Sequence, residues 1–163
     1  SGIDFVHLRK HQSEFDGVDV IVYLREILSA LTIEERQRII IHDYPQLYYD
    51  YSLKGIHINR NVVSLPEDYK GFKTRSCHSF EEIQENTNDY DYLFLSPIFD
   101  SISKRGYTSA FTHEMLQKAS LEGIINEKVI ALGGVTFDKI AYLKELNFGG
   151  IAMLGGLYKL ESL

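Results

Sequence analysis

The sequence predicts an α/β fold of the TIM (β/α)8 barrel type, and three features of the chain lead to it. Short apolar runs recur along the 163 residues, and amphipathic stretches lie between them. Several of these runs are continuously apolar and β-branched, which is typical of strands buried on both faces of a parallel sheet. The last two runs end in paired glycines, Gly133-Gly134 and Gly155-Gly156, and a barrel commonly holds phosphate after its seventh and eighth strands. No G-x-G-x-x-G follows the first run, which argues against an open dinucleotide-binding sheet.

Strands and helices are expected to alternate along the whole chain. The expected strands are residues 3–8, 38–42, 55–59, 74–78, 91–96, 128–132 and 150–154. Val20, Leu24 and Leu28 repeat at helical spacing and predict a helix that covers one face of the sheet. Ser79-Phe80-Glu81-Glu82 reads as a capping box that begins a helix directly after the fourth strand. Thr136 is expected to cap a helix after the sixth strand.

Closure of this barrel needs eight strands, and the sequence predicts only seven. We therefore expect residues 1–163 to form a single barrel domain that lacks the first βα unit and the last helix. Truncation, cleavage and omission from the given sequence are alternative explanations, and the sequence does not separate them.

The composition excludes several classes of protein. With 17 Lys+Arg against 23 Asp+Glu the net charge is −6, which does not suit non-specific nucleic-acid binding. A hydrophobic content of 44% suits one compact domain, and the single cysteine, Cys77, excludes a disulfide scaffold. No apolar run is long enough to cross a membrane and no signal peptide opens the sequence, so we expect a cytoplasmic protein without a membrane partner.

In a parallel barrel the active site lies at the carboxyl ends of the strands, so polar residues there are the candidates for function. Five of the six histidines lie at or just past expected strand ends, and only His113 lies elsewhere. The candidates after the first four strands are His7, Arg9, Lys10, His11, His42, Asp43, His57, Asn59, Arg60, Ser76 and His78.

Two further segments suit the oxygens of a phosphate group. The loop 100–106 carries the hydroxyls of Ser101 and Ser103 beside the charge of Lys104, although an exposed polar loop would look the same. The turn Gly133-Gly134-Val135-Thr136 ends a strand and opens a helix, where a backbone without side chains admits an anion. A tight turn with an ordinary helix cap is the alternative.

The ionisable residues at the strand ends allow several chemistries. Converging histidines could bind Zn²⁺, but no H-x-E or C-x-x-C spacing supports it, and a packing role is the simpler interpretation. His78 is the best acid/base candidate because imidazole titrates near neutral pH. Asp43 could hold Mg²⁺ or pair with Arg9. Cys77 has the opposite strand parity to His78, so we expect a structural thiol that faces the helices.

A series of motifs in this order resembles the thiamine-phosphate synthase/TenI family. The motifs are His7-Leu8-Arg9, Ile41-His42-Asp43, Gly55-Ile56-His57-Ile58, Ser76-Cys77-His78-Ser79-Phe80-Glu81-Glu82, the segment from Asp91 to Lys104, Ala131-Leu132-Gly133-Gly134-Val135-Thr136 and Gly149-Gly150-Ile151-Ala152-Met153-Leu154. The resemblance implies a (β/α)8 barrel that works in thiamine biosynthesis. Synthases of the family join hydroxymethylpyrimidine diphosphate to thiazole phosphate and release diphosphate with Mg²⁺. The TenI branch tautomerises a thiazole phosphate carboxylate and needs no cofactor.

The resemblance also implies roles for individual residues. Arg9, His78 and Lys104 become the catalytic candidates, with Arg9 at the pyrimidine diphosphate, and Asp43 becomes a Mg²⁺ ligand. The implied substrate-binding residues are His7, His42, Ser76, Ser101, Ser103, Gly133, Gly134, Leu154 and Gly155.

Three motifs depart from the synthase pattern. The family's Q-L-R-x-K reads His7-Leu8-Arg9-Lys10-His11, its Asn-Asp pair reads His42-Asp43, and its G-Q-x-D reads Asn59-Arg60-Asn61-Val62. The second carboxylate for Mg²⁺ is therefore Val62. Three hypotheses stay open: a synthase, a tautomerase in which His78 moves the proton, and a non-catalytic binder of phosphorylated ligands. Under each hypothesis we expect small phosphorylated thiazole or pyrimidine partners and no nucleic acid. Whether the chain forms a homodimer stays open.

Overall fold

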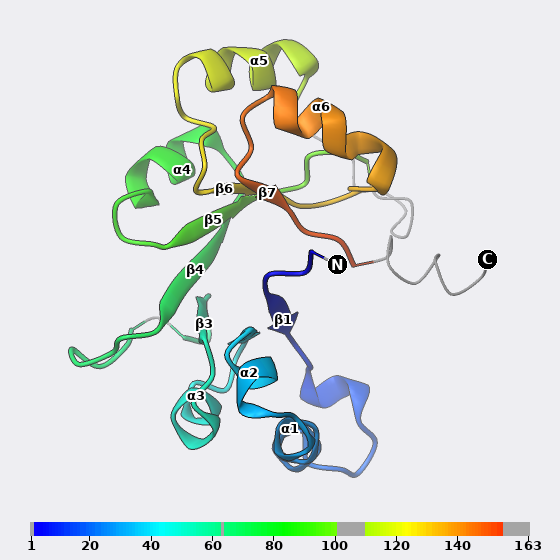
Figure 1. The fold of residues 1–163 in the computed structure, drawn as a ribbon, viewed down its shortest axis with the longest axis vertical. Helices are drawn as coiled ribbons and strands as arrows, with labels where there is room; N and C mark the ends of the chain where they lie inside the picture. Colours follow the sequence, from blue (N-terminus) through cyan, green and yellow to red (C-terminus); the bar gives the residue numbers. More distant parts are fainter. Residues whose placement is uncertain (1, 63, 101–109, 155–163) are drawn as a thin grey trace. The chain divides into compact units, whose positions relative to one another are not determined.

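The computed structural model describes residues 2–62, 64–100 and 110–154, which divide into two compact units. The first unit covers residues 1–74 and the second covers residues 75–163. Strand β4 (Phe72–Cys77) crosses the boundary. In each unit, taken by itself, the helices lie to one side of the strands (Figure 1).

The first unit is built from parallel strands connected by helices. In chain order its elements are β1 (Val6–Leu8), the 3-10 turn η1 (Gln12–Glu14), α1 (Val20–Ala30), α2 (Ile33–Arg36), β2 (Ile39–Ile41), α3 (Gln46–Tyr51), β3 (Gly55–Ile58) and the start of β4. Val6 of β1 lies opposite Ile39 of β2, and Ile40 of β2 lies opposite Gly55 of β3. The strand order follows the chain, as expected for successive right-handed crossovers.

Helix α1 covers this sheet with the apolar face that the sequence predicts. Val20, Leu24 and Leu28 are all buried, and Asp19 caps the helix by accepting a hydrogen bond of 2.8 Å from the Ile21 N–H. The three residues of β2 are also buried, which confirms a strand covered on both faces. Gly55 is required where β4 approaches β3, because a Cβ there would lie 2.2 Å from the Phe72 carbonyl oxygen.

The second unit repeats the same alternation. Its elements are the end of β4, α4 (Phe80–Asn86), β5 (Tyr92–Leu95), α5 (His113–Leu121), β6 (Val129–Ala131), the 3-10 turn η2 (Phe137–Lys139), α6 (Ile140–Glu145) and β7 (Gly150–Ile151). Strands β5, β6 and β7 pair in parallel, with Leu93 opposite Val129 and Ile130 opposite Gly150. One hydrophobic cluster fills the space between strands and helices, and Leu93, Leu95 and Leu143 are completely buried in it.

The two helix caps predicted in this unit have different outcomes. Ser79 caps α4 as predicted, because its hydroxyl accepts the Glu82 N–H at 3.2 Å. Thr136 precedes η2 but does not cap it through its side chain, and its hydroxyl donates instead to Asp138 at 2.5 Å. The predicted cap at Thr136 is therefore wrong in its chemistry, because a nearby carboxylate competes for the hydroxyl.

All seven expected strands occur, within a few residues of their expected bounds, and the predicted parallel α/β class is confirmed. Closure into a barrel, the absent first unit and last helix, and a single domain over residues 1–163 stay predictions. Among the helices that the structure describes, none combines the length and apolarity that a membrane crossing requires.

Candidate functional site

Three histidines of the first unit point to the same side of neighbouring parallel strands. The register places His7 opposite Ile40, and Ile41 opposite Ile56. His42 and His57 each follow by one residue and therefore lie opposite each other. Alternate residues of a strand face the same side, which puts His7, His42 and His57 on one face. The sequence spacing of the three strands therefore creates a histidine cluster toward their carboxyl ends.

The three imidazole rings are in direct contact. His7 Nδ1 and His42 Nε2 are 2.8 Å apart and share a hydrogen bond. The rings of His42 and His57 are stacked, with centroids 4.1 Å apart and planes 12° from parallel. His57 Nδ1 is 2.9 Å from the Thr74 hydroxyl, which comes from β4 within the same unit. One ring nitrogen of each histidine lies within 4.8 Å of those of the other two.

Burial keeps the rings of His7 and His42 uncharged. His42 and His57 are 8% and 4% exposed, and His7 is half-buried. Burial, followed by the repulsion between neighbouring histidines in their protonated forms, lowers the pKa of His7 to about 3 and that of His42 to about 2. Both rings are therefore neutral at pH 7, which is the form of imidazole that binds a metal ion.

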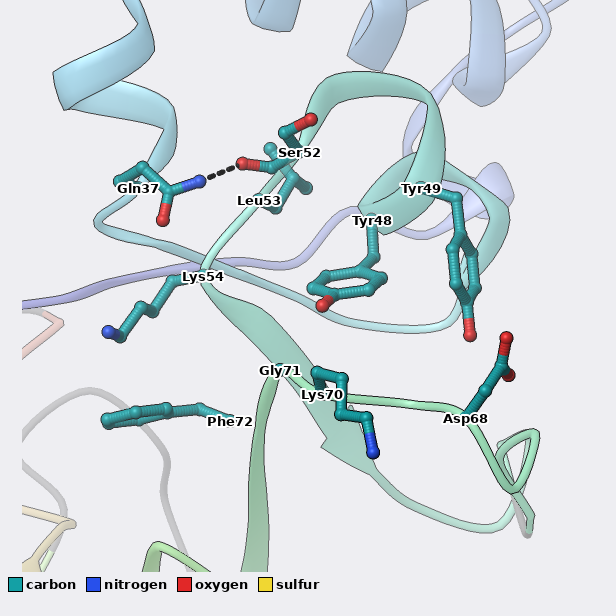
Figure 2. Close-up of a pocket in the computed structure, with 10 residues that line it drawn as sticks. All are labelled: Gln37, Tyr48, Tyr49, Ser52, Leu53, Lys54, Asp68, Lys70, Gly71 and Phe72. Atoms are coloured by element: carbon teal, nitrogen blue, oxygen red, sulfur yellow. Dashed lines mark hydrogen bonds between the residues drawn. The ribbon is translucent and has the colours of Figure 1, made fainter.

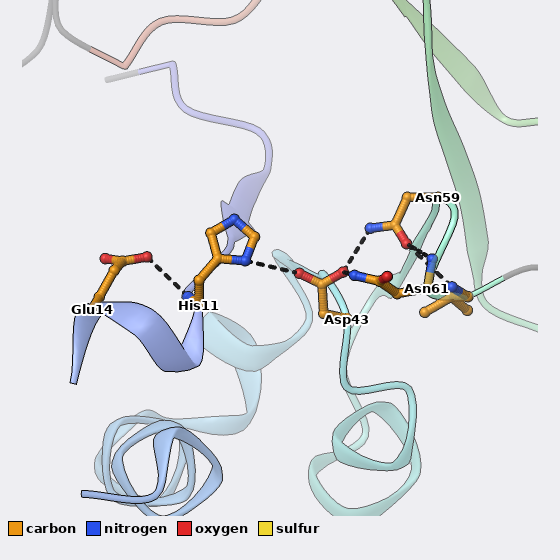
Figure 3. A network of polar contacts seen from close by, with 6 residues as sticks. His11, Glu14, Asp43, Asn59 and Asn61 are labelled. Atoms are coloured by element: carbon orange, nitrogen blue, oxygen red, sulfur yellow. Dashed lines mark hydrogen bonds and ion pairs between the residues drawn. The ribbon is translucent and has the colours of Figure 1, made fainter. Parts of the chain in front are cut away.

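Asp43 follows β2 and is held by a network of polar contacts (Figure 3). Its backbone has a φ of 65°, a left-handed conformation that Asp tolerates better than most residues. Its Oδ1 accepts hydrogen bonds from the side-chain amides of Asn59 at 2.8 Å and Asn61 at 2.9 Å. Its Oδ2 faces His11 Nδ1 at 3.7 Å, and the His11 N–H in turn donates to Glu14 at 2.9 Å.

The second carboxylate oxygen of Asp43 is the atom that stands out. Asp43 Oδ2 is buried and has no hydrogen-bond partner among the described residues. Burial by itself raises the pKa of this carboxyl. The hydrogen bonds from Asn61 and Asn59, followed by the charges of His11 and Arg9, outweigh it, so the pKa of Asp43 is lowered overall. Among the described residues no ion pair joins Asp43 to Arg9, and the nitrogen that faces Asp43 Oδ2 is His11 Nδ1 at 3.7 Å.

The arrangement around Asp43 fits a single carboxylate ligand for Mg²⁺. A buried, ionised oxygen without a hydrogen bond is the donor that a hard cation prefers, and Mg²⁺ takes one or two protein carboxylates together with substrate phosphates. Val62 is buried at 4% exposure and supplies no oxygen from its side chain. Asn59 does not replace it, because its carbonyl oxygen already accepts the N–H groups of Asn61 and Val62.

His78 is the acid/base candidate that the sequence places in the second unit. It follows β4 and is exposed, and its backbone N–H donates to Glu82 at 2.9 Å. Its Nδ1 lies 2.9 Å from the Ser96 carbonyl oxygen, which can only accept, so Nδ1 carries the proton and Nε2 keeps the lone pair. A ring held in this tautomer presents Nε2 as a base.

Cys77, next to His78, faces the hydrophobic cluster as its strand parity predicts. It is completely buried, and burial raises the pKa of its thiol to about 11. The structural role expected for Cys77 is therefore consistent with its surroundings, since an uncharged buried thiol is a poor nucleophile.

The glycine turn after β6 is required by the backbone and by its neighbours. Gly133 and Gly134 have φ values of 93° and 62°, which favour glycine. Added Cβ atoms would lie 2.8 Å from Pro97 and 2.6 Å from the Asp100 carbonyl oxygen. The segment after β5 therefore packs directly on this turn, and only glycines permit that approach.

The remaining predicted site residues differ in their exposure, and some lie outside the described part of the chain. Arg9 is exposed, Ser76 is half-buried and Leu154 is 75% exposed. Ser101, Ser103, Lys104 and Gly155 lie outside the described residues. The first unit thus brings His7, His42 and Asp43 to the ends of neighbouring strands, and the second brings His78 to the end of β4.

A separate pocket of the first unit lies at the amino ends of β3 and β4 (Figure 2). Lys54, Tyr48 and Phe72 line it, and the Lys54 ammonium group lies 4.0 Å from the centre of the Phe72 ring. The Gln37 side chain closes one side by donating to the Ser52 carbonyl oxygen. None of the residues predicted from the sequence lines this pocket.

Sequence reasoning missed two contributors to the site. Thr74 binds a buried histidine, and Asn61 holds Asp43. The signal for Thr74 was available, because it begins the expected fourth strand beside the third. Asn61 follows its strand in an irregular segment, where a sequence pattern does not predict side-chain direction.

The fold and site together define an α/β protein whose ionisable groups lie at the ends of parallel strands. The family model of thiamine monophosphate synthase (TMP-TENI) matches residues 1–157. The chain belongs to the thiamine monophosphate synthase family, which confirms the resemblance seen in its motifs.

Individual relatives agree with this assignment. The thiamine-phosphate synthase of Actinobacillus succinogenes is 26% identical over 125 residues, which are 72% of this chain and 56% of that protein. That of Bacillus mycoides is 26% identical over 99% of this chain and 75% of its own length. This chain therefore spans little more than half of the first relative and three quarters of the second.

Solved structures show the same likeness. The thiamine phosphate pyrophosphorylase of Bacteroides thetaiotaomicron has a TM-score of 0.82 and 35% identity, over 97% of this chain and 73% of that one. The thiamine phosphate pyrophosphorylase of Pyrococcus furiosus, at 17% identity and a TM-score of 0.60, shares the fold.

Proposed function

We propose that this chain is a thiamine-phosphate synthase, which joins hydroxymethylpyrimidine diphosphate to thiazole phosphate and releases diphosphate. The observation that carries the proposal is the buried Asp43 Oδ2, which is ionised and lacks a hydrogen bond within the described residues. A diphosphate leaving group needs its charge neutralised, and a carboxylate aimed at a cation serves that need. The names of the relatives favour the synthase over the tautomerase hypothesis.

The residues of the first unit would receive the diphosphate. Bound Mg²⁺ would neutralise charge on the leaving group, and Asp43 would hold it through Oδ2. Asn59 and Asn61 fix the carboxylate by occupying Oδ1, which leaves the other oxygen for the cation. Arg9 would contact the diphosphate as a fixed positive charge, and His7 and His42 would face the pyrimidine as neutral rings.

The second unit would hold the thiazole phosphate. The family resemblance places Gly133, Gly134, Leu154 and Gly155 at the thiazole phosphate and Ser76 at the diphosphate. Ser101 and Ser103 would supply hydroxyl groups to the substrates. His78 would accept or donate a proton at Nε2 because its Nδ1 is committed to the Ser96 carbonyl oxygen. Lys104 would stabilise the departing diphosphate as a point charge.

The test is a synthase assay with hydroxymethylpyrimidine diphosphate and thiazole phosphate, in which thiamine phosphate and diphosphate are both measured with and without Mg²⁺. Formation of both products only with Mg²⁺ supports the proposal. Absence of both products at every Mg²⁺ concentration refutes it, and conversion of a thiazole phosphate carboxylate alone would indicate the tautomerase.

The matched variants are Asp43→Asn and Asp50→Asn. Asp43→Asn removes the charge at the proposed metal ligand, and we expect the rate to fall at least ~100-fold, as for loss of a transition-state stabiliser. Asp50 pairs with Arg25 on the surface at 2.6 Å, so its replacement controls for loss of one negative charge. An unchanged Mg²⁺ response in Asp43→Asn would remove Asp43 from the metal site.

A further inference from the structure

We propose that His7, His42 and His57 bind a transition-metal ion such as Zn²⁺ through ligands other than Asp43, although His7 and His42 are also the residues proposed to face the pyrimidine. The three rings come from β1, from the residue after β2 and from β3 of one compact unit. One nitrogen of each ring lies within 4.8 Å of those of the others. The proposal does not depend on the proposed reaction, because it concerns the affinity of three nitrogen atoms for a metal.

One of the distances between the nitrogens is close to that in a site with a bound ion. Zn²⁺ binds imidazole nitrogen at about 2.0–2.1 Å in tetrahedral geometry, which places two ligand nitrogens roughly 3.3 Å apart. His7 Nδ1 and His42 Nε2 are already 2.8 Å apart, so only a small separation is needed there. Three histidines leave a fourth position for water or a ligand, as in other sites with an open coordination position.

One ring must turn to complete the geometry. A metal ion lies in the plane of each ring that binds it, and the stacked planes of His42 and His57 are only 12° apart. The His7 ring is steeply inclined to both, at 74° and 81°, so its plane already crosses theirs. Thr74 holds His57, so we expect His42 to turn about χ2, and its bond to the metal then replaces the hydrogen bond that it shares with His7.

The donor atoms and the surroundings of the rings suit a metal ion. The Thr74 hydroxyl contacts His57 Nδ1 and orients the ring, as outer partners of metal-bound histidines do. Three nitrogen donors suit Zn²⁺ and other borderline transition ions, whereas Mg²⁺ prefers oxygen.

The test titrates the metal-free protein with Zn²⁺ by calorimetry in a constant excess of Mg²⁺. We expect one Zn²⁺ per chain, and Co²⁺ in place of Zn²⁺ should show the visible absorption of a four-coordinate site. His7→Gln and His42→Asn each remove one ligand with a side chain of similar polarity. Each should weaken Zn²⁺ binding at least ~10-fold, the smallest loss seen even for outer partners of metal sites.

The matched control is His113→Gln, which removes an exposed histidine of the second unit that contacts Tyr142 at 2.7 Å. This variant should bind Zn²⁺ as the wild type does. Failure of the wild type to bind Zn²⁺, or equal affinities in all four proteins, would overturn the proposal.

A second measurement protects against variants that do not fold. Nuclear magnetic resonance of protein labelled with ¹⁵N-histidine resolves the ring nitrogens of the wild type directly. Zn²⁺ should shift the resonances of His7, His42 and His57 together at one equivalent. Shifts confined to the other histidines would contradict the site. The readout is metal binding alone, so its failure leaves the synthase proposal intact, and failure of the synthase assay leaves this one intact.

Discussion

Thr74 illustrates how one hydroxyl determines the state of a buried ring. The residue is completely buried in β4 and contacts His57 Nδ1 at 2.9 Å, while His57 itself is 4% exposed. A buried ring nitrogen deprived of its partner pays the cost of lost hydration without compensation. The hydroxyl therefore orients the His57 ring, on which the His42 ring is stacked.

We predict that Thr74→Val lowers the free energy of unfolding by about 1–3 kcal/mol, the usual cost of leaving a buried polar group without its partner. Thr74→Ser keeps the hydroxyl and loses only a methyl group, so it should be clearly less destabilised. Urea denaturation of both variants measures the difference. Equal losses would show that the methyl group, and not the hydrogen bond, matters at this position.

At the scale of the element, the turn after β6 is determined by contact with another segment of the second unit. Position 133 requires glycine for two reasons: its φ is 93°, and a Cβ there would lie 2.8 Å from Pro97. Gly123 offers a comparison, since its φ of 73° imposes the same preference but nothing lies within 4 Å of its added Cβ.

Gly133→Ala should therefore destabilise the protein more than Gly123→Ala does. Both variants incur the backbone strain, and only the first adds a steric clash, so we expect a difference of roughly 1–3 kcal/mol, as for other overpacked sites. Chemical denaturation of the two variants in parallel gives this difference. If Gly123→Ala proves as costly, the clash with Pro97 contributes nothing measurable.

The start of α4 joins a helix cap to the candidate base. Ser79 accepts the Glu82 N–H at 3.2 Å, and the Glu82 carboxylate accepts the His78 N–H at 2.9 Å. In a standard capping box that carboxylate would return to the Ser79 N–H. Here it binds one residue earlier, so the same motif both begins the helix and holds the backbone of His78.

Ser79→Ala removes the cap, and we expect a loss of about 1 kcal/mol in the free energy of unfolding, typical of helix N-caps. Ser79→Thr retains a hydroxyl and should stay near the wild-type stability. Thermal unfolding followed by circular dichroism tests both. A Ser79→Ala protein as stable as the wild type would mean that the hydroxyl contributes no capping energy.

At the scale of the whole molecule, buried histidines couple stability to pH. The pKa values of His7 and His42 in the folded chain, about 3 and 2, are far below the ordinary value of 6.5. Below pH 6.5 the unfolded chain binds protons that the folded chain does not accept. The stabilisation is complete above that pH and is lost as the pH falls from 6.5 toward 3.

We predict that the free energy of unfolding of the metal-free protein falls between pH 7.5 and 5, with each histidine contributing up to about 1.4 kcal/mol per pH unit below its unfolded pKa. His7→Gln should have a shallower slope than the wild type, because one of the two titrating rings is gone. The pKa of Asp43 is lowered from 3.8, so that carboxyl titrates below this range.

Urea denaturation at a series of pH values in the presence of a chelator measures the slope. His113→Gln serves as the control, because His113 is exposed and lies outside the cluster. A His7→Gln slope as steep as that of the wild type would contradict the burial argument.

The alternation of strands and helices could be read from the sequence because local patterns determine it. Ile39–Ile41 is apolar at every position and is buried at every position, and Val20, Leu24 and Leu28 form the buried side of α1. The helix cap at Thr136 could not be predicted reliably, because Asp138 competes for the same hydroxyl. The candidate site residues were found from the rule that the active site of a parallel barrel lies at the carboxyl ends of its strands. The roles assigned to them stay predictions.

The contacts of Asp43 show that a position at a strand end does not predict the partners of a side chain. The sequence places a carboxylate after β2, but its partners Asn59 and Asn61 lie on the segment after β3, and they were not expected to bind it. The sequence offered Arg9 as a partner for Asp43, whereas the structure places His11 Nδ1 3.7 Å from Asp43 Oδ2.

By itself, the sequence determined the order of the elements, the parallel arrangement and the family, because periodicity and motifs are properties of neighbouring residues. Tertiary structure alone decided that three histidine rings touch, that Thr74 holds one of them, and that one oxygen of Asp43 is buried without a hydrogen bond. Contact, burial and hydrogen bonding depend on distances between strands that are far apart in the chain, and those distances are set only when the strands come into register.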